Sequence, residues 1–565
     1  RITINNKKTK TLEGKTILEA AKEARIEIPT LCFHPDLKIK SNCRLCLVEI
    51  KGKVGLSTAC STKVEPGMEV VTDSNDIDRA RRSNLELLLS EHCENCGECI
   101  WKQNCQLLKL SLKYKAKINR FNHRKANLPD FQFGPSVSFN SSKCIDCRNC
   151  VEACEKQNVG FLEVRLRNNF WQTLPTNNKK KDCVYCGQCV VHCPVGALEA
   201  AKEFEEVEKP ILEKGKVVVV QFAPSIRASI GEEFGLPHGS IVTGQLAAAI
   251  RQLKVNKVFD VSVGADFTTI EEANELIERL KKRESLPMFT SCCPAWVKYV
   301  EFYHPELIPN LTTVRSPHII MGGLIKTYWS KKEKIDPKKI VVVSIMPCTS
   351  KKYEIRRNEL KINGLRPVDY VLTTRELAYL LTKHDIDLKN TLPGLADHPF
   401  GDPSGAGVIY GASGGVMESA LRTAYQKITQ EKLSKIEFEE VRGLAETKVA
   451  SIKFSDQTLK VAVVNGLGNA EKILQELKRN HRKYDYVEVM ACPGGCIGGG
   501  GQPVPTNNTI RQERAKALYK IDAKKEIRTA NENPELKEVY QDFLFQDEIR
   551  KSICYTKFFL KKKEN

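Results

Sequence analysis

The sequence predicts an α+β chain of several domains, and three observations support this fold class. The chain has 565 residues, 41% of them hydrophobic, which is enough for several hydrophobic cores. Most of its 22 cysteines fall in tight groups, separated by two or three residues, and the larger part of them lies in the amino-terminal third. In the remainder, strand-like and helical segments alternate, as is typical of α/β domains.

Charge and cysteine usage exclude several classes of protein. No apolar run is long enough for a transmembrane helix and no secretory signal is present, so we expect no membrane span. Disulfide-rich secreted chains are usually short, and clustered cysteines favour metal ligation in a reducing compartment. The formal net charge is +19, but the lysines are scattered, so we expect no nucleic-acid binding. A positive surface would instead attract an acidic electron carrier.

Residues 1–78 are predicted to form a β-grasp domain with one 2Fe–2S cluster, as in plant-type ferredoxins. The pattern indicates strands over 1–5 and 47–50 and a helix over 16–24. Four cysteines suit such a cluster: Cys32, Cys43, Cys46 and Cys60. A zinc ribbon is the alternative, but it prefers two Cys-x2-Cys pairs and only one is present.

Residues 79–125 are predicted to hold a small cluster after a helix over 79–89. Spacing permits a site of four cysteines that begins with Cys93. It equally permits a site in which Cys93 is idle and the ligands are His92, Cys96, Cys99 and Cys105. A lone histidine is usually structural, but one beside three well-spaced thiols is a stronger candidate ligand.

Residues 126–208 carry the most specific cysteine pattern, a repeated Cys-x2-Cys-x2-Cys-x3-Cys run whose second copy ends in Cys193-Pro194. This is the two-cluster ferredoxin repeat, in which the fourth cysteine of each run binds the other cluster. One 4Fe–4S cluster is therefore assigned Cys144, Cys147, Cys150 and Cys193. The second is assigned Cys183, Cys186, Cys189 and Cys154.

A lysine- and glutamate-rich helical linker over 201–215 leads to an α/β domain assigned to 209–525, and 526–565 is assigned to a carboxyl-terminal tail. The expected strands are 216–221, 257–263, 340–345, 460–464 and 486–489, and the expected helices include 270–282 and 375–383. Cys348 and Cys492 closely follow two of these strands. Ligand sites in open α/β sheets form beyond the carboxyl ends of strands, so these thiols are expected to share one cleft.

Three motifs in this domain identify a resemblance to a known family: Thr290-Ser-Cys-Cys-Pro-Ala-Trp296, Met346-Pro-Cys-Thr-Ser-Lys-Lys352 and Met490-Ala-Cys-Pro-Gly-Gly-Cys-Ile-Gly-Gly-Gly-Gly501. They resemble, in the same order, the signatures of the iron-only (FeFe) hydrogenases. The resemblance runs from Cys32 to about Tyr519 and includes the accessory domains of the large monomeric clostridial-type members. In that family the second site is a histidine-ligated 4Fe–4S cluster, which favours His92 over Cys93.

The resemblance implies an H-cluster, in which a 4Fe–4S subcluster is joined to a diiron azadithiolate unit bearing CO and cyanide. It also implies three accessory 4Fe–4S clusters, one of them histidine-ligated, and one 2Fe–2S cluster. The ligands carried over by motif are Cys293, Cys348, Cys492 and Cys496, the last bridging to the diiron unit. The pocket residues carried over are Ala223, Pro224, Ser225, Lys351, Met346 and Met490. Lys351 and Ser225 would donate to the two cyanides, and both methionines would pack against the diiron unit.

The resemblance also implies a route for protons. Cys292 would pass a proton to and from the azadithiolate amine, since the pKa of a thiol is tunable. Glu272 and Glu275 are spaced i, i+3 on a predicted helix, with Arg279 one turn later. Without the family, a solvated helix face would be the better interpretation of these glutamates. Thr312 stands where serine is usual in the relay, and its hydroxyl should keep the path.

Two pocket residues depart from the family pattern. His318 replaces a more usual glutamine, and Tyr410 replaces an expected phenylalanine. Either could shift the potential of the cluster or the catalytic bias.

The resemblance implies an enzyme that reversibly oxidises or evolves H2 and exchanges electrons with ferredoxin through its clusters. Alternatives are the catalytic subunit of an NAD-coupled bifurcating hydrogenase and a non-catalytic H-cluster-like sensor. An electron-carrying subunit like those of respiratory NADH dehydrogenases would explain only residues 1–200. Expected partners are ferredoxin or a similar acidic carrier, H2, protons, and maturation enzymes for the diiron unit. The expected location is the cytoplasm, or a hydrogenosome if a transit peptide precedes Arg1.

Overall fold

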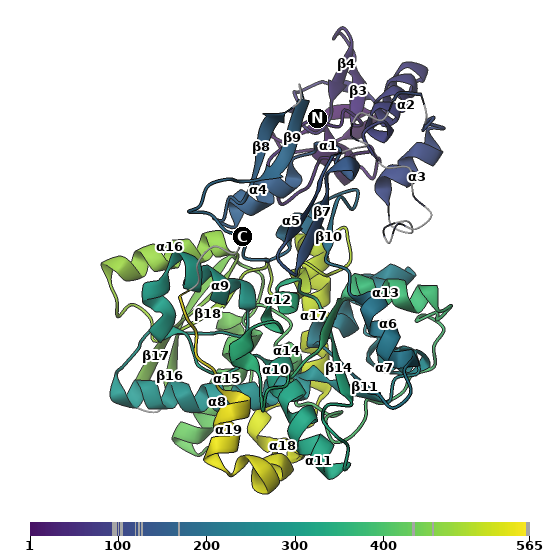
Figure 1. Cartoon of the computed structure of the whole chain (residues 1–565). Coiled ribbons are helices and arrows are strands. Elements are labelled where there is room, and N and C mark those ends of the chain that lie inside the picture. The colour runs from purple at the N-terminus through teal and green to yellow at the C-terminus, as the bar shows by residue number, and fades with distance from the viewer. Residues whose placement is uncertain are drawn as a thin grey trace.

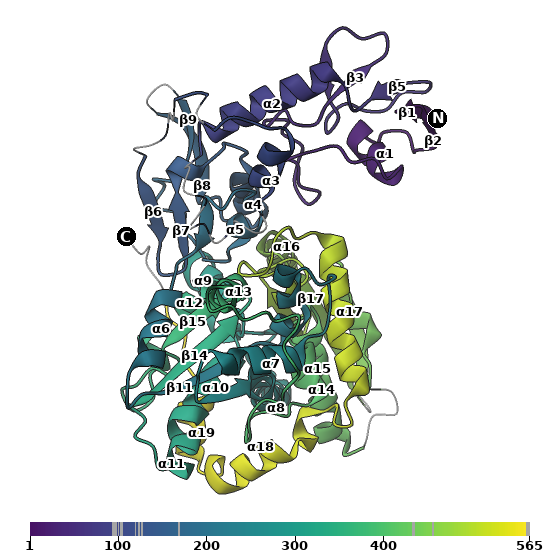
Figure 2. The same ribbon diagram turned by 90° about the vertical axis from the view of Figure 1, so that its right-hand side faces the viewer.

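The computed structural model describes residues 1–92, 96, 99, 101, 105–118, 120–122, 125, 128–167, 170–431, 436–454 and 457–560. The cysteine-rich amino-terminal third forms small modules that sit on one end of a larger α/β body (Figure 1). In the turned view, α2 (Asn75–Leu89) runs along the side of these modules that faces away from the body (Figure 2).

The first module is a five-stranded sheet with the order β2-β1-β5-β3-β4. Its strands are β1 (Ile2–Ile4), β2 (Lys7–Thr9), β3 (Leu47–Ile50), β4 (Leu56–Thr58) and β5 (Glu69–Val71). Helix α1 (Ile17–Glu23) begins at Thr16, whose hydroxyl accepts from Glu19 N while the Glu19 side chain accepts from Thr16 N. The two strands and the helix expected here agree with the structure within one residue at each end.

The second and third modules hold the middle groups of cysteines. Their elements are α3 (Gln106–Lys113), β6 (Asp130–Phe133), β7 (Val137–Asn140), α4 (Asn149–Lys156), β8 (Leu162–Arg167), β9 (Phe170–Pro175), α5 (Gln188–Val191) and β10 (Leu198–Ala200). The two copies of the cysteine repeat fold alike, because each places a short helix after a residue with positive φ. Arg148 precedes α4 with φ 63°, and Gly187 precedes α5 with φ 69°.

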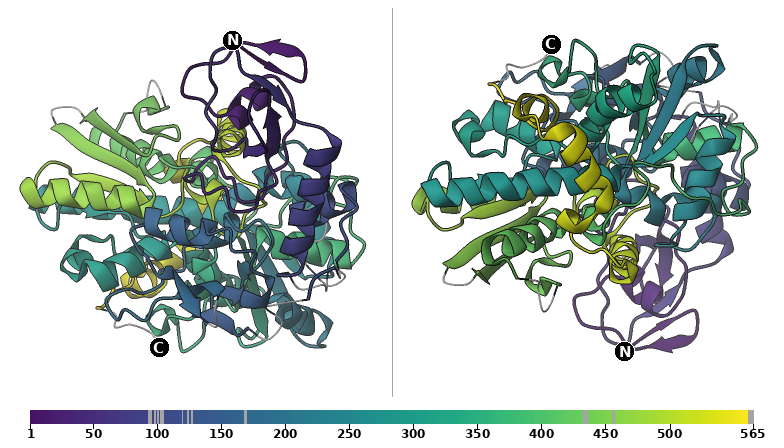
Figure 3. Two further views of the ribbon diagram at one scale, coloured as in Figure 1. Left: turned by 90° about the horizontal axis from the view of Figure 1, so that it is seen from above. Right: turned by 90° about the horizontal axis from the view of Figure 1, so that it is seen from below.

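The body contains two four-stranded sheets on opposite sides of a central group of helices (Figure 1). One sheet is parallel and runs β12 (Lys257–Asp260), β11 (Val217–Phe222), β14 (Ile340–Met346), β15 (Tyr370–Thr373). The other runs β13 (Met288–Phe289), β18 (Tyr486–Met490), β17 (Gln457–Asn465), β16 (Thr447–Phe454), and only β16 is antiparallel to its neighbour. The strands β16 and β17 and α16 (Leu467–Arg479) project to one side when the molecule is seen from above (Figure 3).

The central helices are α8 (Val261–Lys282), α10 (Pro317–Leu324), α14 (Gly405–Ile409) and α15 (Gly415–Thr429), and α8 contacts the other three. The remaining helices of the body are α6 (Phe204–Leu212), α7 (Thr243–Gln252), α9 (Pro294–Tyr303), α11 (Ser330–Lys332), α12 (Ser350–Glu354), α13 (Thr374–Lys383), α17 (Asn508–Lys524), α18 (Pro534–Val539) and α19 (Asp547–Cys554).

The strand expected over 257–263 is longer than the observed strand, since β12 ends at Asp260. The Asp260 side chain accepts from Ser262 N and so starts α8 at Val261, nine residues before the expected helix over 270–282. The first half of α8 is buried on all sides. It therefore lacks the one-sided apolar pattern that identifies a surface helix, and its β-branched residues suggest a strand instead.

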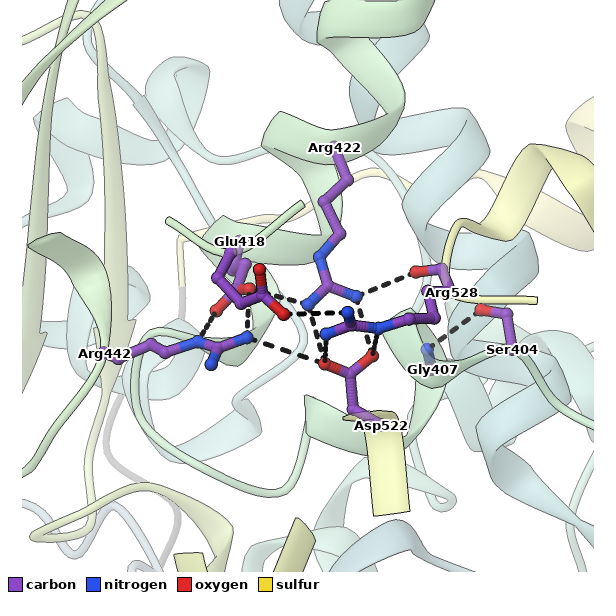
Figure 4. Close-up of polar contacts among 8 residues, drawn as sticks. Ser404, Gly407, Glu418, Arg422, Arg442, Asp522 and Arg528 are labelled. Carbon is purple, nitrogen blue, oxygen red and sulfur yellow. Dashed lines mark hydrogen bonds and ion pairs between the residues drawn. The ribbon is translucent and has the colours of Figure 1, made fainter. Parts of the chain in front are cut away.

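The carboxyl-terminal segment folds onto the body as far as it is described. Helix α17 contacts α14, while α18 and α19 contact α8. A buried ion network fixes α17 to α15: Arg422 Nη1 and Nη2 lie 2.9 and 2.8 Å from the two carboxylate oxygens of Asp522 (Figure 4). Glu418, Arg442 and Arg528 complete this network. The segment assigned to a tail therefore contains two helices, α18 and α19, that pack on the body.

A helix that spans a bilayer must be both long and apolar. None of the helices in the part of the chain that the structure describes combines the length and the apolar composition needed to cross a bilayer.

Candidate functional site

Four segments of the body meet around a buried cavity of about 70 Å³, and each follows the carboxyl end of a strand. The strands are β11, β13, β14 and β18. The cavity wall includes these predicted site residues: Ala223, Pro224, Ser225, Cys292, Cys293, Met346, Cys348, Lys351, Met490, Cys492 and Cys496. His318 and Tyr410 also line it. The expectation that the thiols share one cleft beyond strand ends agrees with this arrangement.

Four of these thiols lie together on the wall. Burial, and then the charges of Cys348 and Cys293, raise the pKa of Cys492 and bring that of Cys496 to about 12. Four soft donors held this closely fit an iron–sulfur cluster. The chain turns sharply between two of them, because Gly495 has φ 85° and a Cβ there would lie 2.7 Å from Ser413 N.

Two fixed donors face the cavity beside the thiols. Lys351 Nζ donates to Glu354 Oε2 at 2.7 Å and to Cys292 O at 3.1 Å. Burial alone would lower the pKa of Lys351, but Glu354 outweighs it and raises that pKa, so the ammonium stays charged. Ser225 is fully buried, and its hydroxyl accepts from Gln502 Nε2 at 3.3 Å. Gln502 also donates to Cys496 O, at 3.1 Å.

Cys292 and Glu272 form the inner part of the predicted proton route. Burial, and then the Glu272 carboxylate, raise the pKa of Cys292 well above its usual value, so Cys292 is held as a thiol. Burial also raises the pKa of Glu272 to about 8. Tyr486 donates to Glu272 Oε1 at 2.8 Å, and within the described residues Glu272 Oε2 is buried without a hydrogen-bond partner.

Glu275, Thr312 and Arg279 form the outer part of the route. Glu275 Oε2 accepts from Thr312 Oγ1 at 2.8 Å, and Glu275 Oε1 accepts from Arg279 Nη2 at 2.5 Å. Glu275 and Arg279 also line an open surface cleft of about 1190 Å³. The predicted relay residues thus extend from the cavity wall to the surface, although Glu272 makes no hydrogen bond to Glu275 among the described residues.

The eight cysteines of the ferredoxin repeat influence one another in two sets. Burial is the main cause that raises the pKa of each thiol, and in six of the eight a neighbouring thiol adds to it. Cys193 raises the pKa of its three neighbours, Cys144, Cys147 and Cys150. Cys154 does the same for Cys183, Cys186 and Cys189. No disulfide joins any described cysteine.

The fold also brings together the cysteines within each of the two smaller groups. Cys43 N donates to Cys32 Sγ at 3.4 Å, and Cys60 is the main cause that raises the pKa of Cys46, with Cys43 contributing. In the next group, burial and then the charges of Cys99 and Cys96 raise the pKa of Cys105.

His92 stands beside this second group. The ring of His92 is buried, and its Nδ1 donates to Lys143 O at 2.8 Å. In a metal-binding histidine, the ring nitrogen that does not bind the metal typically donates to an oxygen in this way. Cys93 lies outside the described residues.

The second group of the ferredoxin repeat lies directly against the cavity loops. Thr349 Oγ1 and Ser350 Oγ both donate to Tyr185 O at 2.7 Å. Gln188 Nε2 donates to Gly498 O at 3.0 Å. These bonds fix the loop that carries Cys186 onto the loops that carry Cys348 and Cys492.

Four residues of the site were not predicted from the sequence. Glu354 and Gln502 hold Lys351 and Ser225, while Tyr486 and Thr313 contact the relay glutamates. Glu354 lies three residues after Lys351 in a helix, a spacing that could have indicated an ion pair. The other three are joined to their partners only by the tertiary fold.

Comparisons with known proteins agree with this arrangement. Residues 216–500 match a family model described as the iron only hydrogenase large subunit, C-terminal domain. Other matches are a 2Fe-2S iron-sulfur cluster binding domain at 1–75, a 4Fe-4S dicluster domain at 143–197 and an iron hydrogenase small subunit at 508–551.

Two relatives match almost the whole chain. The NADP-reducing hydrogenase subunit HndD of Solidesulfovibrio fructosivorans is 40% identical over 96% of this chain and 95% of its own length. Iron hydrogenase 1 of Clostridium pasteurianum is 39% identical over 96% of each chain. A solved structure of an apo variant of the FeFe-hydrogenase HydA1 from Chlamydomonas reinhardtii is 36% identical, with a TM-score of 0.57, and covers 64% of this chain and 99% of that one.

The fold and the site therefore define an iron–sulfur oxidoreductase, in which cluster-binding domains precede a catalytic α/β domain. The chain belongs to the iron-only hydrogenase family. The resemblance seen in the sequence is confirmed, and so is the mixed α/β organisation with 2Fe–2S and 4Fe–4S domains. Membership of the family implies an H-cluster and accessory iron–sulfur clusters, and it supports oxidation or evolution of H2.

Proposed function

We propose that this chain catalyses the reversible heterolytic oxidation and evolution of H2 and exchanges the electrons with ferredoxin. The observation that carries the proposal is the convergence of four thiols, the Lys351 ammonium and the Cys292 thiol on one buried cavity. The thiols would hold the H-cluster, with Cys496 as the bridge to the diiron unit. When bound, that group supplies the iron site at which H2 is split.

The residues of the wall would hold this anionic group in a dry pocket. Lys351 and Ser225 offer N–H and O–H donors to the cyanides, and they are fixed in advance by Glu354 and Gln502. Met346 and Met490 contribute apolar contact. Fixed donors in a pocket without water act more strongly than the same donors in solvent.

The proton would leave through Cys292, which burial keeps in the thiol form that can both give and regain a proton. Glu272 is the next group, and its raised pKa suits a carboxyl that must be protonated near neutral pH. Glu275, with Thr312 and Arg279 beside it, would carry the proton to the surface cleft.

Electrons would pass through domains at 1–78, 79–125 and 126–208, with the catalytic domain at 209–525 and a final segment at 526–565. These domains would hold one 2Fe–2S cluster, a 4Fe–4S cluster ligated by His92, and two further 4Fe–4S clusters. The contact between the loop that carries Cys186 and the cavity loops supports the second ferredoxin-type cluster as the neighbour of the H-cluster.

Infrared spectroscopy of the protein made with its maturation enzymes tests this function. Bands for CO and cyanide bound to iron are expected, together with H2 oxidation. A matured sample that oxidises no H2 and has no such bands would refute the proposal.

The electron partner needs its own test, because one relative at 40% identity is an NADP-reducing hydrogenase subunit. We favour ferredoxin, since the net charge of +19 suits an acidic carrier. The purified chain should then evolve H2 from reduced ferredoxin alone, with a rate that falls as salt is added. Activity that requires NADPH and further subunits would instead support the second candidate, a subunit of an NADP-linked hydrogenase.

A further inference from the structure

His318 lies at the start of α10 and is 1% exposed. Its Nε2 is 2.6 Å from Glu354 Oε2, and its Nδ1 is 3.2 Å from Ser344 Oγ. Ser344 Oγ already accepts from Gln221 Nε2 at 2.6 Å, so its own proton is available for His318 Nδ1. Because the ionised Glu354 carboxylate can only accept, the hydrogen of the ring is assigned to Nε2, which donates to Glu354.

Glu354 joins this histidine to Lys351. Lys351 Nζ donates to the same oxygen of Glu354 at 2.7 Å and to Cys292 O at 3.1 Å. Two of its three N–H groups are thereby used, which leaves one for the cavity that Lys351 lines. Burial opposes ionisation of Glu354, but Lys351 and His318 outweigh it and lower the pKa of Glu354 to about 2.

The ring of His318 is neutral at working pH. Burial, and secondly the Lys351 ammonium, lower the pKa of His318 to about 4. A neutral donor leaves the Glu354 carboxylate its negative charge. His318 donates to the same oxygen of Glu354 that accepts from Lys351. His318 therefore fixes the direction of the carboxylate, and it limits how strongly Glu354 draws Lys351 away from the cavity.

We propose that His318 is a positioning residue for Lys351 and acts through Glu354. It sets how much of the lysine donor is presented to the group bound in the cavity. The inference rests on the proposed function, in which Lys351 donates to a cyanide. A glutamine, the more usual residue at this position, also has a donor and an acceptor, but it carries them on a flexible chain rather than on a rigid ring.

A double-mutant cycle on the matured protein tests this role by infrared spectroscopy. The proteins are the wild type, His318→Leu, Glu354→Met and the double variant. His318→Leu should displace one cyanide band, and it should cause no further displacement in the Glu354→Met background. His318→Gln should return the band toward the wild-type position. An equal displacement in both backgrounds would show that His318 acts directly on the cofactor, and this would overturn the proposal. The absence of any displacement in either background would overturn it too.

The same proteins without the diiron unit supply a second readout. If His318 holds Glu354, their apparent denaturation midpoints should be non-additive across the cycle, whereas additive midpoints would overturn the proposal. This arm also separates the two hypotheses. A wild type without CO and cyanide bands defeats the proposed function, and the denaturation cycle then still decides whether His318 positions Glu354.

Discussion

Gly187 and Gly500 meet backbone to backbone where the second ferredoxin-type group reaches the cavity. A Cβ on Gly500 would lie 2.6 Å from Gly187 Cα, and a Cβ on Gly187 would lie 2.8 Å from Gly500 Cα. No side chain separates the two loops at this point. Gly187 also has φ 69°, a conformation that favours glycine.

Gly500→Ala should push these two loops apart and slow electron transfer between them. H2 oxidation with an external acceptor is expected to fall, while H2/D2 exchange, which needs no electrons from the accessory clusters, should persist. Comparison of the two rates in one preparation checks this. Gly394→Ala is the control, because the atom nearest to its added Cβ is Arg251 Nη1 at 3.3 Å, the far end of a long side chain rather than backbone. An equal loss of both rates in Gly500→Ala would place the damage in the cavity instead.

Cys292→Ala should abolish proton delivery while leaving the cofactor bound. Because loss of a positioned proton donor typically costs about 100-fold to 10,000-fold, turnover should fall by that order. The CO and cyanide bands should remain, since Cys292 is not among the four thiols proposed to hold the H-cluster. Turnover near the wild-type rate would show that another group donates the proton.

Glu272 should make stability depend on pH. Burial raises its pKa to about 8 in the folded protein, from a usual value of 4.5. The folded state therefore binds this proton more tightly, and the resulting stabilisation is complete below pH 4.5 and lost as the pH rises through about 8. The wild type should lose stability relative to Glu272→Gln over that range. Denaturation midpoints measured at stepped pH would show it, and a constant difference would contradict the raised pKa.

His92→Ala should change the electron paramagnetic resonance signal of one 4Fe–4S cluster. The contact of His92 Nδ1 with Lys143 O leaves the ring oriented as in metal-binding histidines. Cys93→Ala is the matched control and should leave every signal unchanged. The reverse result would assign the ligand to Cys93.

The ion network of Arg422 should be costly to break. Arg422→Leu removes a positive charge that pairs with the buried carboxylates of Asp522 and Glu418. Breaking a buried ion pair in this way typically lowers the free energy of unfolding by about 3–5 kcal/mol. Thermal unfolding would report the loss. Lys516→Ala removes an exposed ion pair with Glu513 on the same helix and should cost less than about 1 kcal/mol. Comparable losses in both variants would mean that the buried network adds little.

Local chemistry made much of the fold predictable. Thr16 with Glu19 marks a helix start by a capping box, and Leu47–Ile50 forms a strand within the expected limits. The start of α8 was missed because its first residues are buried on every side and show no helical periodicity. Strand β13 has only two residues, Met288–Phe289, which is too few for any pattern.

The site was predictable where ligand spacing is dictated by a cluster and unpredictable where contacts cross the fold. Cys144 and its repeat follow a spacing that cluster geometry imposes. Tyr486 and Gln502 reach Glu272 and Ser225 across 214 and 277 residues of chain, so no local pattern could connect them.

The network between Arg422 and Asp522 joins two segments that match separate large- and small-subunit models, 216–500 and 508–551. Here both segments belong to one polypeptide, so their association is unimolecular and cannot be reversed by dilution. A short tether holds such a segment at an effective concentration on the order of millimolar. The buried charges therefore need only align α17 on the body, and cleavage of the connection at 501–507 would turn the same contact into one that depends on protein concentration.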